Sequence, residues 1–368
     1  MSAQQLPQPP DPEQLDVVID GDELQAAELF HGWGWTDGLP IVVPTRERVA
    51  AMCAGATRYP LESVGTLLPR GGPATIQKIA INAVMAGCLP EHMPVLMAAV
   101  EAIQDPQFNL FGVQTTTHPC GVLVLVHGSI ATDLGMNAGH GCFGPGNRAN
   151  AAIGRAMRLI LHNIGGGIPG EADKATQGSP AKYTYCVAEN EAAGPWPPFR
   201  VSLGFDVADS CVTVVAAEGP HNINDHGSTS GESLLNTIAE TMATAGNNNL
   251  YVGGDTFLVL GPEHARTIAE SGFSRQDVQR YLYEHARVSV DRISPQKLAE
   301  LSSWGGWADQ LAGWAGRIPL VREVESIRVL VAGGAGKHSC WIPTFAVTYS
   351  ATRRIVRESA ICKLGGDS

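Results

Sequence analysis

The sequence predicts an α/β fold made of two related helix–strand–helix lobes with mixed sheets. A continuous apolar run at 121–126 and a largely apolar one at 211–217 are typical of strands that are buried on both faces, and 327–331 is a further predicted strand. Amphipathic stretches alternate with these runs. The clearest is 148–163, where apolar residues recur along one helical face. A proline-rich segment at 194–198 divides the chain of 368 residues, which is long enough for two domains.

We predict a flexible arm over residues 1–20, an N-terminal α/β lobe over 21–193 and a C-terminal α/β lobe over 199–368. Threonine and asparagine residues mark expected helix starts in the first lobe, because their side chains cap free N–H groups. The helices of this lobe are predicted at 22–32, 46–53, 76–86, 95–103 and 148–163. The last of them follows Asn147 and ends before Gly165.

Extended runs at 180–189 and 199–203 are predicted as strands on either side of the proline-rich segment. The second lobe is expected to hold strands at 211–217, 257–260 and 327–331, and helices at 234–244, 263–270 and 275–285. Residues 274–277 read Ser-Arg-Gln-Asp, which matches a capping box at the start of the last helix.

Two stretches of the chain are similar to each other. Residues 79–87 match 238–246, and each stretch precedes an Asn-Leu-aromatic element, a strand, a short helix and a long helix. This pattern favours duplication of one unit, with a site in the cleft between the lobes. The alternative is a chance likeness of two α/β segments. Because only the first copy carries a histidine-rich loop, we expect asymmetric chemistry.

The composition excludes several classes of function. A net charge of -11 argues against non-specific binding of nucleic acid, and no basic run indicates a membrane surface. The longest apolar stretch, 93–103, is too short to span a bilayer, and residues 1–13 do not resemble a signal peptide. Eight cysteines without framework spacing predict reduced thiols in a cytoplasmic protein, and we expect a homo-oligomer.

The glycine-rich loop 138–148 leads directly into the helix at 148–163. Helix N-termini offer free N–H groups and a positive dipole to anions. We therefore predict that Asn147 and Arg148 hold a carboxylate or phosphate, with Arg148 making a bidentate contact. The alternative is a loop whose glycines serve only the backbone turn.

Histidines and cysteines are paired more often than chance predicts. Three His-x-Cys triplets occur, at 118–120, 140–142 and 338–340. In an extended segment, residues i and i+2 point to the same side, so each triplet is able to aim an imidazole and a thiol at one point. A divalent metal is an open alternative, although the spacing typical of structural zinc sites is missing.

Two further polar clusters follow predicted strands. His221 and His226 lie in a segment with Asn222 and Asp225, where Asp225 is placed to orient a histidine for acid–base work. An Asx-rich turn is the structural alternative. Lys337 and His338 follow a glycine-rich turn, and Lys337 is a candidate for an anion contact. Lys182 is a weaker candidate.

Several motifs resemble a family of bacterial proteins associated with UGSC-motif proteins, which carry cysteine or selenocysteine. They are Trp35 to Pro40, Ala83 to Cys88, Phe143 to Asn150 and Gly333 to Ser339. The resemblance covers most of the chain and implies no known reaction. It implies a two-component system in which a thiol- or selenol-bearing partner supplies the redox-active residue, because this chain has no UGSC motif.

These observations predict a cytoplasmic enzyme that acts on a small polar or anionic metabolite by histidine acid–base chemistry, as a lyase or hydrolase. The alternatives are a metal-dependent enzyme using the same histidines and a non-catalytic subunit of a UGSC-type partner. The predicted catalytic residues are His118, His140, His221, Asp225, His226 and His338. The predicted substrate-binding residues are Asn147, Arg148, Asn222 and Lys337.

Overall fold

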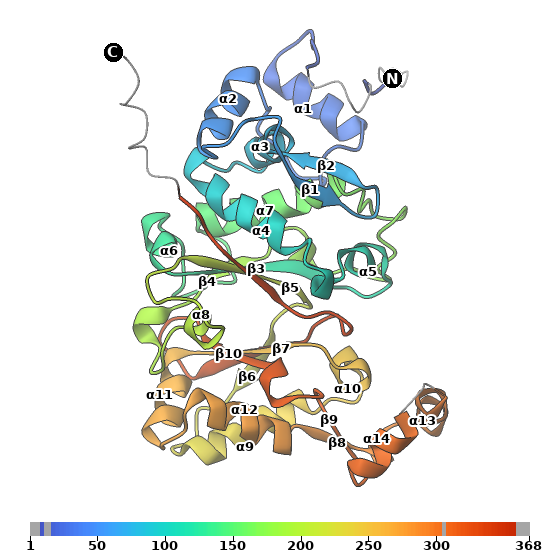
Figure 1. Cartoon of the computed structure of the whole chain (residues 1–368), viewed down its shortest axis with the longest axis vertical. Helices are drawn as coiled ribbons and strands as arrows, with labels where there is room; N and C mark the ends of the chain where they lie inside the picture. The colour runs from blue at the N-terminus through green and yellow to red at the C-terminus, as the bar shows by residue number, and fades with distance from the viewer. Residues whose placement is uncertain (1–7, 11–15, 304–306, 358–368) are drawn as a thin grey trace.

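The computed structural model describes residues 8–10, 16–303 and 307–357. Most of the predicted arm at 1–20 therefore lies outside the described residues. The remainder forms an α/β structure of four layers, in which two four-stranded sheets lie between two layers of helices (Figure 1). The predicted α/β class with mixed sheets is confirmed.

The first sheet has the order β12-β5-β3-β4, and the second has the order β10-β7-β11-β6. The strands of the first sheet are β3 (Gly121–His127), β4 (Cys186–Ala188), β5 (Cys211–Ala217) and β12 (Ala351–Arg354). Those of the second are β6 (His221–Asn224), β7 (Thr256–Leu260), β10 (Ile327–Val331) and β11 (His338–Ile342). Two two-stranded antiparallel sheets lie outside these sheets: β1 (Ser63–Leu67) with β2 (Gly72–Thr75), and β8 (Arg287–Ser289) with β9 (Arg317–Pro319).

Helices cover the outer face of each sheet (Figure 1). The helices of the first part of the chain are α1 (Glu23–Gly32), α2 (Arg46–Ala54), α3 (Ile76–Met85), α4 (Met93–Ala102), α5 (Leu110–Thr115), α6 (Ser129–Asp133) and α7 (Arg148–Asn163). Those that follow are α8 (Phe199–Ser202), α9 (Gly231–Met242), α10 (Asn248–Val252), α11 (Pro262–Glu270), α12 (Arg275–His285), α13 (Pro295–Ser302) and α14 (Trp307–Gly313). The predicted caps Thr45, Thr75 and Asn147 and the capping box at Ser274 are confirmed.

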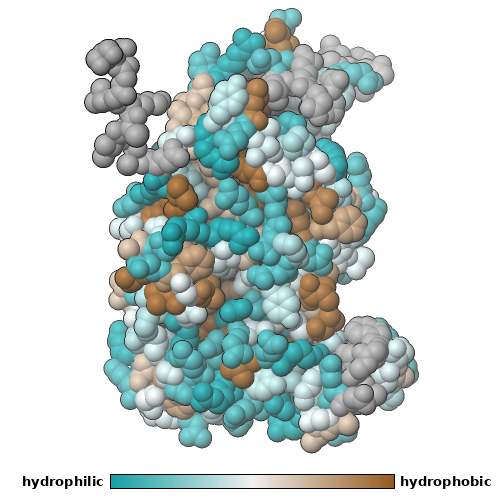
Figure 2. All heavy atoms as spheres, viewed as in Figure 1, coloured by the Kyte–Doolittle hydropathy of each residue, from teal (hydrophilic) through white to brown (hydrophobic). Residues whose placement is uncertain are grey.

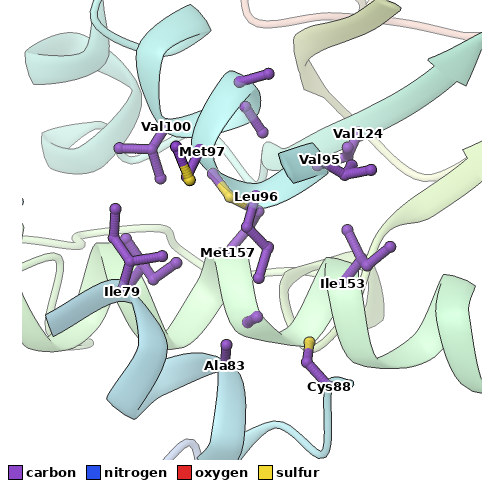
Figure 3. Close-up of a cluster of buried hydrophobic side chains, with 14 of the residues drawn as sticks. Ile79, Ala83, Cys88, Val95, Leu96, Met97, Val100, Val124, Ile153 and Met157 are labelled. Atoms are coloured by element: carbon purple, nitrogen blue, oxygen red, sulfur yellow. The ribbon is translucent and has the colours of Figure 1, made fainter. Parts of the chain in front are cut away.

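Successive side chains of the central strands point to opposite faces of the sheet, and this alternation produces the layers. Val122, Val124 and Val126 of β3 pack in the core formed with α3, α4 and α7. The intervening Leu123 and Leu125 pack with the second sheet. Figure 3 shows Met157 of α7 among the side chains of α3 and α4. Because both faces of β3 are covered, its sequence is a continuous apolar run.

The two sheets share one topology. β3 is parallel to β4 and antiparallel to β5, just as β7 is parallel to β10 and antiparallel to β11. The strand that follows each of these sets of three joins the other sheet. β6 follows β5 and pairs with β11, and β12 follows β11 and pairs with β5. The two halves of the chain therefore exchange their last strands. This agreement supports the duplication predicted from the sequence.

The exchange also shows where the sequence prediction differs from the structure. The predicted lobes meet at 194–198, yet β5 lies beyond that point and belongs to the first sheet. The predicted strand at 199–203 is wrong, because α8 forms there. Only 186–188 of the predicted strand at 180–189 is a strand, β4. Residues 221–224, predicted as loop, form the edge strand β6, since the backbone of β11 supplies hydrogen bonds that no local pattern reveals.

The turn at Trp35 to Pro40 is held by the polar face of α7. Arg155 makes a bidentate ion pair with Asp37, with both N–O distances at 2.8 Å, and Asn163 donates to the carbonyl of Trp35. Burial raises the pKa of Asp37, but Arg155 outweighs it and the pKa is lowered. Arg155 and Asn163 thus hold this turn against α7.

No helix among the described residues is long and apolar enough to cross a membrane. Figure 2 shows one face of the molecule, on which hydrophobic residues appear at separate places among hydrophilic ones. Ionisable side chains are therefore the better guide to function on this face.

Residues 343–350 lead from β11 in the second sheet to β12 in the first sheet. The position of this segment depends on Asn249, which is fully buried. Its amide donates to Gly253, Asp255 and Thr344 and accepts from the N–H of Thr344. Asn249→Ala leaves buried polar groups without partners, and we expect a loss of at least about 2 kcal/mol in the free energy of unfolding. Urea unfolding followed by circular dichroism measures it.

The matched control is Asn248→Ala, one position earlier on α10, whose half-buried side chain makes no hydrogen bond to the described residues. This variant should stay within about 0.5 kcal/mol of wild type. Equal losses in the two variants would contradict the role assigned to Asn249.

Candidate functional site

Some of the predicted residues lie in two clusters, and His140, Asn147 and Arg148 lie outside both. His118 lies just before β3 and contacts Glu218, the first residue after β5. His226 and His338 contact each other at the edge of the second sheet, beside Asn222 and Lys337. Among the described residues, no hydrogen bond joins one cluster to the other.

The first cluster lies where the two halves exchange strands. The N–H of Glu218 donates to the carbonyl of Pro343, and the N–H of Phe345 donates to the carbonyl of Ala216. Nε2 of His118 lies 2.8 Å from Oε1 of Glu218, and Nδ1 of His118 is 3.3 Å from the N–H of Cys120. The backbone N–H is the donor to Nδ1, so Nε2 carries the proton given to Glu218.

Both members of this pair are well packed. The side chain of His118 is 10% exposed and lies against the ring of Phe345, with centroids 5.3 Å apart. The side chain of Glu218 is 29% exposed, and its backbone carbonyl accepts from the hydroxyl of Tyr185. In the described part of the chain, Oε2 of Glu218 has no hydrogen-bond partner. This carboxylate therefore has one fixed oxygen and one oxygen left for a ligand.

Three more ionisable side chains lie near Cys120. Lys182 donates to both carboxylate oxygens of Asp173, at 2.8 and 2.9 Å, and Arg158 of α7 is 3.7 Å from the same carboxylate. All three side chains are at most 14% exposed. Burial lowers the pKa of Arg158, although Asp173 opposes the shift. Two buried cations thus share one carboxylate.

Lys182, Asp173 and Glu218 all affect the pKa of the Cys120 thiol. Burial raises the pKa of Cys120 to about 12, Lys182 opposes this shift, and Asp173 and Glu218 add to it. A cavity of about 20 Å³ lies among Cys120, Lys182 and Arg158, which is room for a single water. This cavity is therefore too small for a metabolite.

Sequence reasoning missed Glu218, Asp173 and Arg158 and ranked Lys182 low. Glu218 offered a usable signal, because it is the first charged residue after the apolar strand 211–217. Arg158 and Asp173 gave none, since each occupies an ordinary polar position in a helix or loop. Only the fold places them beside Cys120.

The second cluster lies on β6, β11 and the loop after β6. His338 is 3.0 Å from the amide oxygen of Asn222 through Nδ1 and 3.3 Å from Nε2 of His226 through Nε2. Lys337 donates to the backbone carbonyl of His226. His221, on the same strand, is exposed and lies edge-on to Trp341.

Asp225 does not orient a histidine through its side chain. Its carboxylate accepts from the N–H groups of Gly227 and Ser228 and from the hydroxyls of Ser228 and Thr237. These contacts form the Asx turn that leads into α9, which was the structural alternative. Only the backbone carbonyl of Asp225 meets an imidazole, that of the buried His264. The side chain of Asp225 therefore forms this turn, and its predicted catalytic role stays a prediction.

The glycine-rich loop reaches Glu218 through Tyr185, whose ring contacts Phe143 and whose hydroxyl donates to the carbonyl of Glu218. The ring of His140 packs against Gly334, where a Cβ atom would lie 2.1 Å from Nδ1. Asn147 caps α7 by accepting from the N–H of Asn150. Arg148 is exposed, and its Nε donates to the carbonyl of Gly87 beyond the end of α3. The predicted anion contact of Arg148 remains a prediction.

The His-x-Cys triplets do not combine into a metal centre. In the described ranges, no group of three or more His, Cys, Asp or Glu side chains is arranged to hold a metal ion. Cys142 and Cys340 pack in the apolar layer between the sheets. Burial raises the pKa of Cys340 to about 12, which makes its thiol a poor ligand.

A groove of about 2340 Å³ lies beside α1, α2 and α3. None of the predicted site residues lines it.

No protein-family model matches the sequence, and searches of curated proteins and of solved structures found no significant match.

The thiols should be reduced and unreactive in the folded protein. Seven of the eight cysteines lie within the described residues and are unpaired. Titration with a thiol reagent in denaturant without reductant should recover eight thiols, whereas the buried ones should react slowly at pH 8 in the native state. Recovery of fewer thiols would reveal a disulfide.

The Asx turn predicts a pH-dependent contribution to stability. Hydrogen bonds from Ser228, Thr237 and Gly227 outweigh the effect of burial and lower the pKa of Asp225 to about 2. A lowered pKa means that the carboxylate stabilises the fold above pH ~4, its ordinary range, and loses this effect as the pH falls towards 2.

Asp225→Asn should therefore be less stable than wild type at pH 7, and this difference should shrink between pH 4 and pH 2. Urea unfolding across this range measures it. A difference that does not change with pH would show that the charge of Asp225 is unimportant.

Proposed function

We propose that this protein is an enzyme that moves a proton on a small anionic metabolite, in a reaction of the lyase or hydrolase type, with Glu218 as the acid–base group. The observation that carries the proposal is the His118–Glu218 pair. One carboxylate oxygen is fixed at 2.8 Å by an imidazole, and the other has no partner among the described residues.

In this proposal His118 is a positioning residue. Its Nδ1 is engaged by the N–H of Cys120, so its Nε2–H points at Glu218 and keeps the carboxylate in one orientation. A general base must lie within hydrogen-bond reach of the proton that it removes. A fixed carboxylate with one open oxygen meets the first requirement for such a group.

Lys182 and Arg158 attract an anionic substrate at longer range, because the cavity beside them has room for only a single water. Asp173 neutralises only one of these two cations, and the ammonium group of Lys182 has three donors, of which Asp173 takes two. Burial strengthens the remaining electrostatic attraction, since little water screens it. Lys182 and Arg158 are therefore favoured over Arg148 and Lys337 as the source of positive charge.

The test uses a panel of small carboxylates and phosphates in D2O, followed by proton NMR. Proton transfer at carbon replaces hydrogen with deuterium, and hydrolysis or elimination produces new signals. We expect the purified chain to change at least one component, and Glu218→Gln to slow that change by about 100-fold or more while the melting temperature stays near wild type.

Glu270→Gln is the control, because Glu270 is an exposed carboxylate at the end of α11. It should retain the full rate. If Glu218→Gln lowers the melting temperature but not the rate, the His118–Glu218 pair only holds the segment after β5 against the start of β3, and the proposal is wrong.

A further inference from the structure

We infer that His226 and His338 form a binding site for one transition-metal ion of the zinc or nickel type. The site is separate from Glu218 and does not rest on the proposed function. The two Nε2 atoms lie 3.3 Å apart, and the rings meet at 79°. Two nitrogens bound at ~2.0–2.1 Å to a tetrahedral ion lie roughly 3.3–3.4 Å apart. The pair is therefore already spaced to bind one ion.

A neighbouring amide selects the correct tautomer of His338. Its Nδ1 lies 3.0 Å from the side-chain oxygen of Asn222, which only accepts. Nδ1 must therefore carry the proton, and Nε2 is left with a lone pair directed at His226. Metal-binding histidines usually have such a partner on their second nitrogen, which fixes the ring and its tautomer.

Both histidines have rigid support. His338 begins β11, which pairs with β6 and β7. His226 follows β6, and the hydrogen bonds of the Asp225 carboxylate fix the turn around it. Ligands held by a sheet and a fixed turn lose little entropy when they bind an ion.

The surrounding charges are mixed. Lys337 donates to the carbonyl of His226, and its positive charge opposes an ion. Asp225 adjoins His226, and Glu263 accepts from the N–H of Gly336 two residues before His338, so two carboxylates offset Lys337. Because the pair is exposed, solvent also screens Lys337.

Two protein ligands leave part of the coordination shell open. Within the described residues, no third His, Cys, Asp or Glu completes the set. Water or an oxygen of a small molecule would take the remaining positions, as in open metal sites. Imidazole nitrogen suits zinc, copper and nickel, whereas carboxylate-rich sites suit magnesium and calcium.

The test is calorimetric titration of the full-length, reduced protein with Zn2+ and, separately, with Ni2+. We expect one ion per chain. His226→Ala and His338→Gln should each weaken binding at least tenfold, and Asn222→Ala should weaken it about tenfold by releasing the ring of His338. The ion should raise the melting temperature of wild type but not of His338→Gln.

His221→Ala is the matched control, because His221 is an exposed histidine at the start of β6, whereas His226 follows the end of that strand. Its affinity should equal that of wild type. Absence of a one-to-one site in wild type, or unchanged binding in the double variant His226→Ala/His338→Gln, would overturn the inference. Thermal unfolding of each variant without metal shows whether it is folded.

Discussion

Each of the two sheets is completed by a strand from the other half of the chain, so neither sheet is complete without its partner. β6 leaves the first half to pair with β11, and β12 leaves the second half to pair with β5. Between the sheets lies an apolar layer to which both contribute, with Leu125 on one side and Phe257 on the other. Exchange and burial together make the two halves one structural unit.

Ionisable side chains also meet where the chain passes from one sheet to the other after β5. A chain that leaves its sheet must satisfy its backbone groups away from the regular ladder. Here the segments after β5 and β11 pair with each other, through Glu218 with Pro343 and Phe345 with Ala216. The side chain of Glu218 is thereby brought to His118. The proposed active site is thus a consequence of the strand exchange.

The two halves differ at this position. The pair Gly121–Ala217 in the first sheet corresponds to Phe257–Ile342 in the second. By this register His118 corresponds to Gly254, and Glu218 corresponds to Pro343. The second half instead holds the buried network of Asn249, whose hydrogen bonds fix the segment from β11 to β12. At this position the first half carries the ionisable groups His118 and Glu218, and the second half carries the hydrogen bonds of Asn249 that stabilise the strand exchange.

The sequence alone determined the elements with strong local signals. Asn147 and Ser274 mark helix starts because capping depends on neighbouring residues only, and β3 is recognisable because burial on both faces requires a continuous apolar run. The similarity of 79–87 to 238–246 likewise indicated two related units. Tertiary structure decided what depends on distant partners. β6 is a strand only because β11 lies beside it, Asp225 serves a turn, and Glu218, Lys182 and Asp173 meet around Cys120 from three separate segments. No local pattern encodes such meetings, since they follow from how the sheets exchange strands.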